Sequence, residues 1–169
     1  MGPPTFVVTA RLDDASSHAM DLLRKRYFPP GRNFIPAHLT LFHKLPIEGV
    51  EVLEQALGDR RPGPFDLEMT EPYSLGRGVA IRVVSGLLTG LRDELASRLD
   101  GYLSPQDRQP FRPHVTVQNK VSAEEARECL AELDRTWQPR RARVEAVDVW
   151  RYLDGPWSFH ARLSLEEGR

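Results

Sequence analysis

The sequence predicts an α+β protein in which two similar halves form one domain of 169 residues. The same order of elements occurs twice: strand, helix, histidine-bearing strand, helix and strand. The stretch FIPAHLTLFHK at 34–44 also has a counterpart in FRPHVTVQNK at 111–120. We therefore expect approximate halves at 1–77 and 78–169, related by an approximate two-fold axis and facing each other across a cleft.

The first half contains three strand patterns and two helix patterns. Asp13 or Asp14 is suited to cap the first helix, and Val52, Leu53 and Leu57 share one face of the second, which RRPGP ends. The expected elements are a strand at 5–12, a helix from Asp13 or Asp14 to about Tyr27, a strand at 38–45, a helix at 48–57 and a strand at 65–69.

The second half repeats this order and adds a closing hairpin. Ser122, followed by Glu125, predicts a capping box, and DGP at 154–156 predicts a turn. We expect the crossing between the halves at 71–78. The expected elements are a strand at 79–84, helices at 86–103 and 122–133, and strands at 114–121, 143–153 and 157–165.

Composition excludes several classes of protein. The 23 Lys and Arg residues are balanced by 24 Asp and Glu, so no global basic field attracts long nucleic acid. No apolar run approaches the ~20 residues of a membrane span, and the N-terminus does not resemble a signal peptide. The single cysteine, Cys129, lies in a helical pattern and reads as a small buried hydrophobe. We expect a cytoplasmic protein without membrane contact, and no protein partner is evident.

The two matching strands carry a histidine and a threonine two residues apart. Residues i and i+2 of a strand share a face, so His38 and Thr40 lie together, as do His114 and Thr116. The aliphatic residues between them face the core. Two halves related by a two-fold axis would bring both polar faces together.

These residue types suit acid–base chemistry on a phosphate. Two imidazoles can serve as general base and general acid, because an unperturbed pKa of about 6.5 suits both roles near neutral pH. Threonine hydroxyls can donate to non-bridging phosphate oxygens. Each motif offers one imidazole and no carboxylate or thiolate pair, so we expect no metal site. No P-loop, GxGxxG or GxSxG motif occurs, so no cofactor is expected.

Neighbouring residues are candidates for binding substrate. Alternation along the motif strands places a phenylalanine, a glutamine and two lysines on the catalytic face, and two arginines fall at comparable places in the first strand of each half. Phe42 can stack a base or pack in the core, the lysines can bind phosphate or be solvated, and the arginines can line the cleft or form surface ion pairs. The candidates are Phe42, Lys44, Gln118, Lys120, Arg11 and Arg82. We assign the remaining histidines and hairpin aromatics to structure or surface: His18, His43, His160, Trp150, Tyr152 and Trp157.

The motifs HLTL and HVTV, in two similar halves of a chain this size, resemble those of the 2H phosphoesterase superfamily. The resemblance implies a bilobed α+β fold with antiparallel sheets flanking a cleft and helices outside. It also implies metal-independent hydrolysis of 2′,3′-cyclic phosphates of RNA ends or small nucleotides, with His38, Thr40, His114 and Thr116 as the catalytic residues. The segment FHKLP, after the first motif, departs from the apolar, glycine-containing continuation usual in the better-known branch of that superfamily.

Two other functions are compatible with the same residues. A 2′-5′ RNA ligase needs the same groups, because ligation differs from hydrolysis only in whether a hydroxyl or water attacks. A binding module for RNA ends or nucleotides could keep the cleft without turnover. In all three cases the expected partner is a nucleotide or an RNA end bearing a 2′,3′-cyclic phosphate.

Overall fold

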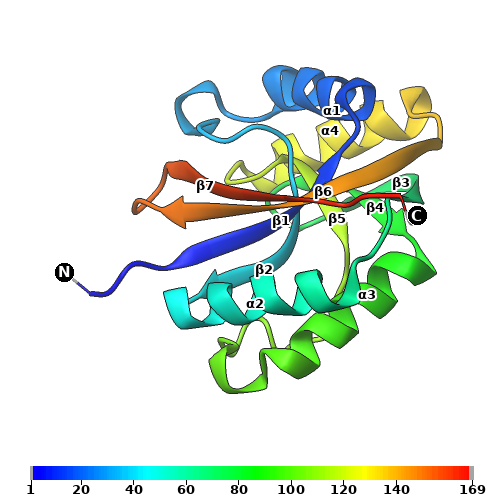
Figure 1. Ribbon diagram of the computed structural model, residues 1–169. Helices are drawn as coiled ribbons and strands as arrows, with labels where there is room; N and C mark the ends of the chain where they lie inside the picture. The colour runs from blue at the N-terminus through cyan, green and yellow to red at the C-terminus, as the bar shows by residue number, and fades with distance from the viewer. Residues whose placement is uncertain (1, 168–169) are drawn as a thin grey trace.

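The computed structural model describes residues 2–167, and in it the predicted α+β order is confirmed (Figure 1). The strands are β1 (Phe6–Leu12), β2 (Leu39–Leu45), β3 (Phe65–Ser74), β4 (Val79–Val84), β5 (His114–Gln118), β6 (Arg140–Tyr152) and β7 (Trp157–Ser164). The α-helices are α1 (Asp14–Tyr27), α2 (Ile47–Arg60), α3 (Gly86–Arg98) and α4 (Ala123–Thr136), and 3₁₀ turns lie at Pro30–Arg32 and Asp100–Tyr102. None of the helices among these residues is long and apolar enough to cross a membrane.

The strands form one antiparallel sheet in the order β1-β2-β5-β4-β3-β6-β7. Because β1 also pairs with β6, six strands close into a barrel-like ring, and β7 extends it by pairing with β6. The two motif strands, β2 and β5, are neighbours in this ring, with Leu39 paired to Val115. The topology therefore brings together two strands that lie far apart in the sequence.

The repeat in the sequence does not coincide with the grouping of strands in space. The last strand of the first half, β3, pairs with β4 and β6, whereas β6, from the second half, pairs with β1. Residues 71–78, where we expected a crossing between lobes, complete β3 and turn back into β4 as a hairpin. The two halves thus exchange their last strands and fold as one unit.

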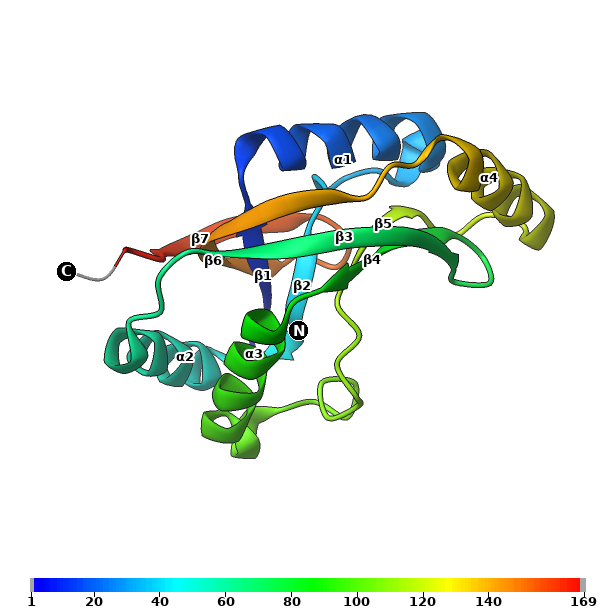
Figure 2. The ribbon, with the colours of Figure 1, turned by 90° about the vertical axis from the view of Figure 1, so that its right-hand side faces the viewer.

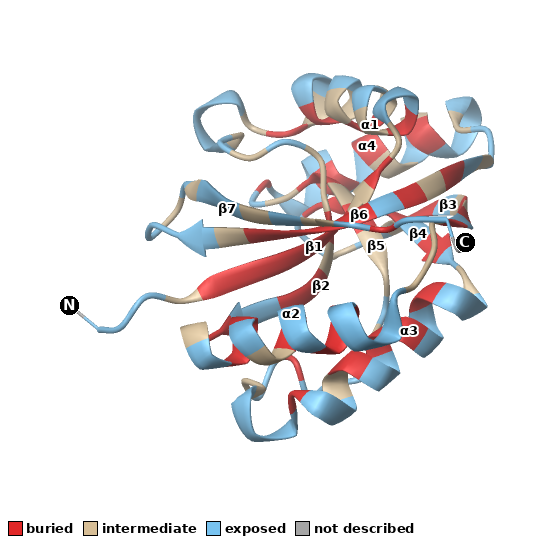
Figure 3. Cartoon of the chain, in the orientation of Figure 1, coloured by how far each residue is buried: buried red, intermediate tan, exposed pale blue. Residues whose placement is uncertain are grey.

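The helices also pack across the halves. Helix α1 packs mainly on β5 and α4 mainly on β3, while α2 and α3 pack against each other on the other side of the sheet (Figure 2). Buried residues follow the inner faces of the strands and helices (Figure 3). Fully buried members of this core include Leu39, Leu53, Ile81, Leu88, Leu95, Val115 and Val117.

Local sequence signals account for most element ends. Asp13 accepts a hydrogen bond from the Ser16 amide at the start of α1, and Ser122 accepts one from the Glu125 amide at the start of α4. The closing hairpin turns through residues 154 and 155, which both have positive φ. Two predicted ends were too late: α3 ends at 98 rather than about 103, and β5 ends at 118 rather than 121.

Candidate active site

The pairing of β2 with β5 gathers the four motif residues on one face. Leu39 pairs with Val115, and both side chains are fully buried. Extending this antiparallel register by one residue each way sets His38 opposite Thr116 and Thr40 opposite His114. The two histidines are then diagonal neighbours, for which the expected separation is about 7–8 Å. A phosphate fits between two imidazoles at this spacing.

Both imidazoles are held in the same way. Nδ1 of His38 lies 2.8 Å from the Pro36 carbonyl oxygen, and Nδ1 of His114 lies 2.7 Å from the Arg112 carbonyl oxygen. A carbonyl only accepts, so Nδ1 carries the proton in both rings. In the neutral form Nε2 is therefore the unprotonated nitrogen, and it is free to accept or return a proton. Each ring is oriented by the backbone of its own strand entry.

The predicted alternation of faces fails at one equivalent point in both motif strands. Thr40 pairs with Thr9 but Phe42 pairs with Val8, and Thr116 pairs with Ala80 but Gln118 pairs with Val79. Each register shift is a β-bulge that inserts one residue immediately after the His-x-Thr sequence.

These bulges correct two expectations about substrate binding. Phe42 is 0% exposed and Gln118 is 5% exposed, so neither side chain is presented to a ligand at the surface. The Arg92 guanidinium lies 4.3 Å from the centroid of the Phe42 ring, which fixes it in the core. A Cβ on Gly78 would lie 2.0 Å from the Gln118 carbonyl oxygen, so the second bulge also requires glycine beside it.

The two arginines predicted to be comparable occupy equivalent places. Arg82 pairs with His114 across β4 and β5. Ala10 pairs with Leu39, so the next position sets Arg11 across from His38. Each guanidinium also forms an exposed ion pair, Arg11 with Asp14 at 2.9 Å and Arg82 with Glu71 at 2.8 Å. The predicted surface ion pairs are thus present, both arginines lie on strands next to the motif histidines, and their role in binding substrate stays a prediction.

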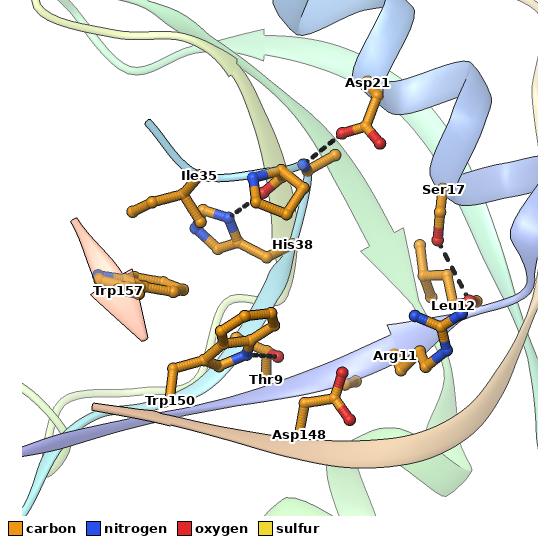
Figure 4. Close-up of a pocket in the computed structure, with 13 residues that line it drawn as sticks. Thr9, Arg11, Leu12, Ser17, Asp21, Ile35, His38, Asp148, Trp150 and Trp157 are labelled. Atoms are coloured by element: carbon orange, nitrogen blue, oxygen red, sulfur yellow. Dashed lines mark hydrogen bonds between the residues drawn. The ribbon is translucent and has the colours of Figure 1, made fainter. Parts of the chain in front are cut away.

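The surroundings of His38 are enclosed and aromatic. A cavity of about 130 Å³ opens beside the ring, between β1, α1, the loop before β2, and strands β6 and β7 (Figure 4). The Trp157 ring lies 4.7 Å from the imidazole, centroid to centroid. Trp150 donates its Nε1–H to the Thr9 hydroxyl at 3.0 Å at the same cavity. The Asp21 carboxylate accepts a hydrogen bond from the amide of Ala37, directly before His38.

His114 lies beside a tyrosine and an arginine. Its nearest aromatic ring is Tyr73, edge-on with a centroid separation of 6.2 Å. The Arg82 guanidinium covers the same tyrosine at 4.5 Å. Burial raises the pKa of Tyr73, while Arg82 and Arg112 oppose this rise. The tyrosine hydroxyl is therefore neutral at physiological pH.

The pKa of His38 is lowered from 6.5 to about 4. The main cause is burial, which removes water from the imidazolium, and the charges of Arg24, His114 and His43 lower the pKa further. The hydrogen bond from Nδ1–H to Pro36 acts in the opposite direction. His38 is therefore neutral near pH 7, with a lone pair on Nε2, which is the state that a general base needs.

The lysines lie outside this constellation. Lys44 and Lys120 each follow a motif histidine by six residues, a span of about 20 Å along an extended chain. Lys44 is exposed, and Lys120 lies beyond the end of β5 with a φ of 62°. A phosphate bound by either lysine would therefore lie further along a nucleotide chain, and this role of the lysines stays a prediction.

The remaining titratable residues behave largely as predicted. His43 donates its backbone N–H to the Asp107 carboxylate and places Nδ1 3.1 Å from Asp107 Oδ1, which ties β2 to the loop at 104–109. His18 is exposed, and His160 packs on Phe6. Cys129 is buried, and burial raises the pKa of its thiol to about 11, so it is an unreactive core residue.

Sequence reasoning missed three residues near the motifs. Trp157 was assigned to hairpin packing, yet it contacts His38. Tyr73 was placed in a connection between lobes, yet it borders His114. Arg24, in α1, is 4% exposed and acts electrostatically on His38. None of the three stands near a motif in the sequence, so no local pattern could have identified them.

The whole-chain comparisons agree with this geometry. The family model of the 2′-5′ RNA ligase superfamily matches residues 12–156, so the chain belongs to this superfamily, which is part of the 2H phosphoesterases. Phosphoesterase or ligase chemistry is the class of activity that this membership supports. None of the curated proteins matches the chain.

Several solved structures share the fold. Escherichia coli LigT complexed with 3′-AMP superimposes with a TM-score of 0.67 at 20% identity, over 98% of this chain and 100% of that one. TT0787 of Thermus thermophilus gives 0.67 at 16% identity over the same shares. Kluyveromyces marxianus Usb1 with uridine monophosphate gives 0.55 at 13% identity, over 97% and 98%. At these identities the likeness establishes the fold alone.

Proposed function

We propose that this protein hydrolyses 2′,3′-cyclic phosphates, at RNA ends or on small nucleotides, by two-histidine acid–base catalysis without a metal ion. The observation that carries the proposal is the pairing of β2 with β5, which sets two identically oriented imidazoles and two threonines on one face. The structures of LigT with 3′-AMP and Usb1 with uridine monophosphate, both nucleotide complexes of proteins with this fold, are consistent with a nucleotide ligand.

The unequal settings of the two histidines favour one division of labour. Neutral His38 takes a proton from water through Nε2, and the water oxygen forms a bond to phosphorus. Protonated His114 gives the proton on Nε2 to the departing ribose O3′ as the P–O3′ bond breaks. The product is a 2′-phosphate with a free 3′-hydroxyl, and the two imidazoles have exchanged protonation states.

The neighbouring groups support the charge that develops on the phosphate. Thr40 and Thr116 can donate hydroxyl hydrogen bonds to non-bridging oxygens, and Arg11 and Arg82 supply positive charge from either side. Among residues 2–167 no group of three or more His, Cys, Asp or Glu side chains is placed to hold a metal. The proposal assigns charge stabilisation to the arginines and threonines.

Direct assay of turnover tests this proposal. We expect the protein to convert 2′,3′-cyclic AMP, and a short RNA ending in a cyclic phosphate, to 2′-phosphate products that ³¹P NMR distinguishes from 3′-phosphates. The rate should be the same with and without EDTA. Saturable binding without product would identify a binding module instead. Joining of the RNA to a second strand with a 5′-hydroxyl would identify ligation as the main reaction. Loss on chelation, restored by a divalent ion, would make the histidines metal ligands.

A further inference from the structure

Arg24 is a buried cation beside the candidate site. Its side chain is in α1, and the residue is 4% exposed. It forms no ion pair within 4 Å among the described residues. Burial lowers its pKa, and Asp21 is the neighbouring charge that opposes this. Arginine nevertheless remains charged in proteins, so a positive charge is held here at a considerable desolvation cost.

The contacts of Arg24 connect both motif strands. Its Nη1 donates to the Thr116 carbonyl oxygen of β5 at 3.0 Å. Its Nε donates to Oδ1 of Asn33, in the loop that leads to His38, at 3.1 Å. The guanidinium also lies 4.1 Å from the centroid of the Phe28 ring. One side chain from the first half therefore holds the catalytic strand of the second half and the approach to the catalytic histidine of the first.

We propose that Arg24 is a positioning residue that fixes β5 and the loop before His38 against α1, and that it places a buried permanent cation beside the candidate site. The catalytic meaning of this role rests on the function proposed above. The electrostatic effect of Arg24 on His38 is independent of that function, because it exists in the protein without substrate. A buried cation without an ion-paired carboxylate also favours an anionic ligand at the shared face.

Other charged groups around His38 are less able to supply this effect. Arg11 on β1 is paired with Asp14, and Asp148 on β6 is paired with Arg162 at 2.8 Å. The Asp21 carboxylate on α1 accepts from the Ala37 amide. The remaining charges are His43 on the same strand and His114 on β5, and both are cationic only when protonated. Arg24 is the permanent cation among those that lower the pKa of His38.

Arg92 provides a matched control from the second half. It lies in α3, is 6% exposed and donates from Nε to the Leu41 carbonyl oxygen of β2 at 3.0 Å. Its guanidinium also stacks on aromatic rings. Arg24 and Arg92 thus each lie in the first helix of their own half and hold the motif strand of the opposite half. Arg92 is not among the charges that lower the pKa of His38.

The experiment is an NMR titration of the His38 ring in the free protein and in Arg24→Met, Arg24→Gln, Arg24→Lys and Arg92→Met. The His38 pKa should rise by about half a pH unit or more in the Met and Gln variants, because a nearby cation has been removed. It should stay low in Arg24→Lys and in Arg92→Met. Arg24→Gln keeps a donor for the Thr116 carbonyl, so it carries the test if Arg24→Met does not fold.

Activity adds a second readout. The acid limb of kcat/KM for 2′,3′-cyclic AMP should move to higher pH in Arg24→Gln by the same amount as the NMR pKa, and Arg92→Met should leave it in place. An unchanged His38 pKa in both uncharged variants would overturn the inference about Arg24. A shifted pKa in a protein without turnover would leave that inference standing and overturn the proposed function instead.

Discussion

The two histidines have matched positions but different surroundings. Each follows a proline-containing entry, donates Nδ1–H to the carbonyl two residues back, lies across from an arginine and precedes a β-bulge. His38 nevertheless lines a cavity and packs against a tryptophan, whereas His114 lies beside a tyrosine and an arginine. The repeat supplies equal geometry, and the neighbours outside the repeat make the two imidazoles chemically unequal.

One source of this inequality is β7. Three strands from each half form the ring of six, and β7 is an additional strand that pairs with β6. It brings Trp157 against His38. The desolvation that lowers the pKa of His38 therefore depends partly on an element without a counterpart near His114.

The largest expected effect is loss of either catalytic imidazole. His38→Ala and His114→Ala should each reduce turnover of a 2′,3′-cyclic phosphate by ~10²–10⁴-fold, the usual contribution of one acid or base. Steady-state kinetics on folded protein measures this. His18→Ala, on the exposed surface of α1, is the control and should retain wild-type activity. Full activity in either catalytic variant would refute the two-histidine mechanism.

The next largest effect should come from the flanking arginines. Arg11→Ala and Arg82→Ala should each lower kcat/KM by about 10-fold, because each removes one charged donor near the phosphate. Arg141→Ala removes an exposed cation that pairs with Glu68 away from the site, and it should change kcat/KM little. If only one of the two site variants is affected, the two halves hold the phosphate asymmetrically.

Stability should depend on pH through His38. Its folded-state pKa of about 4 is below the unfolded value of 6.5, so the unfolded chain binds the proton more readily. The contribution of His38 is therefore full above pH 6.5 and is lost as pH falls towards 4. We expect the free energy of unfolding to fall by about 1–2 kcal/mol over this range. This is less than the full pKa shift would give, because the ring keeps some solvent contact.

Chemical denaturation at several pH values measures this loss. His38→Gln should lose less stability than the wild type between pH 6.5 and 4, whereas Thr40→Val, a non-titrating change at the same site, should follow the wild type. If the free energy of unfolding depends on pH equally in His38→Gln and the wild type, then folding does not lower the pKa of His38.

The smallest effect is expected from the lysines. Lys44→Ala and Lys120→Ala should alter kcat/KM for 2′,3′-cyclic AMP by less than about twofold, because each lysine follows its histidine by six residues and lies away from the histidine pair. Repeating the assay with a longer RNA tests whether either lysine contacts phosphates further along the chain. A tenfold loss with the mononucleotide would contradict the geometry described above.

The order of elements, the duplication and the four motif residues can be read from the sequence. Period-two alternation, helix caps and each His-x-Thr motif are local patterns of about ten residues, and the duplication follows from comparing the two halves. The same local rule failed at Phe42 and Gln118, because a β-bulge depends on the strand across the sheet. Faces of a strand can be predicted only as far as its register stays regular.

The neighbours of each histidine depend on the tertiary structure. The exchange of β3 and β6 between the halves, the packing of α1 on β5 and the placement of Trp157 beside His38 all join residues far apart in the chain. A pKa depends on the burial and charges around a group in space. The sequence therefore identified two equivalent histidines, and only the fold made one of them the neutral, enclosed imidazole that can act as a base.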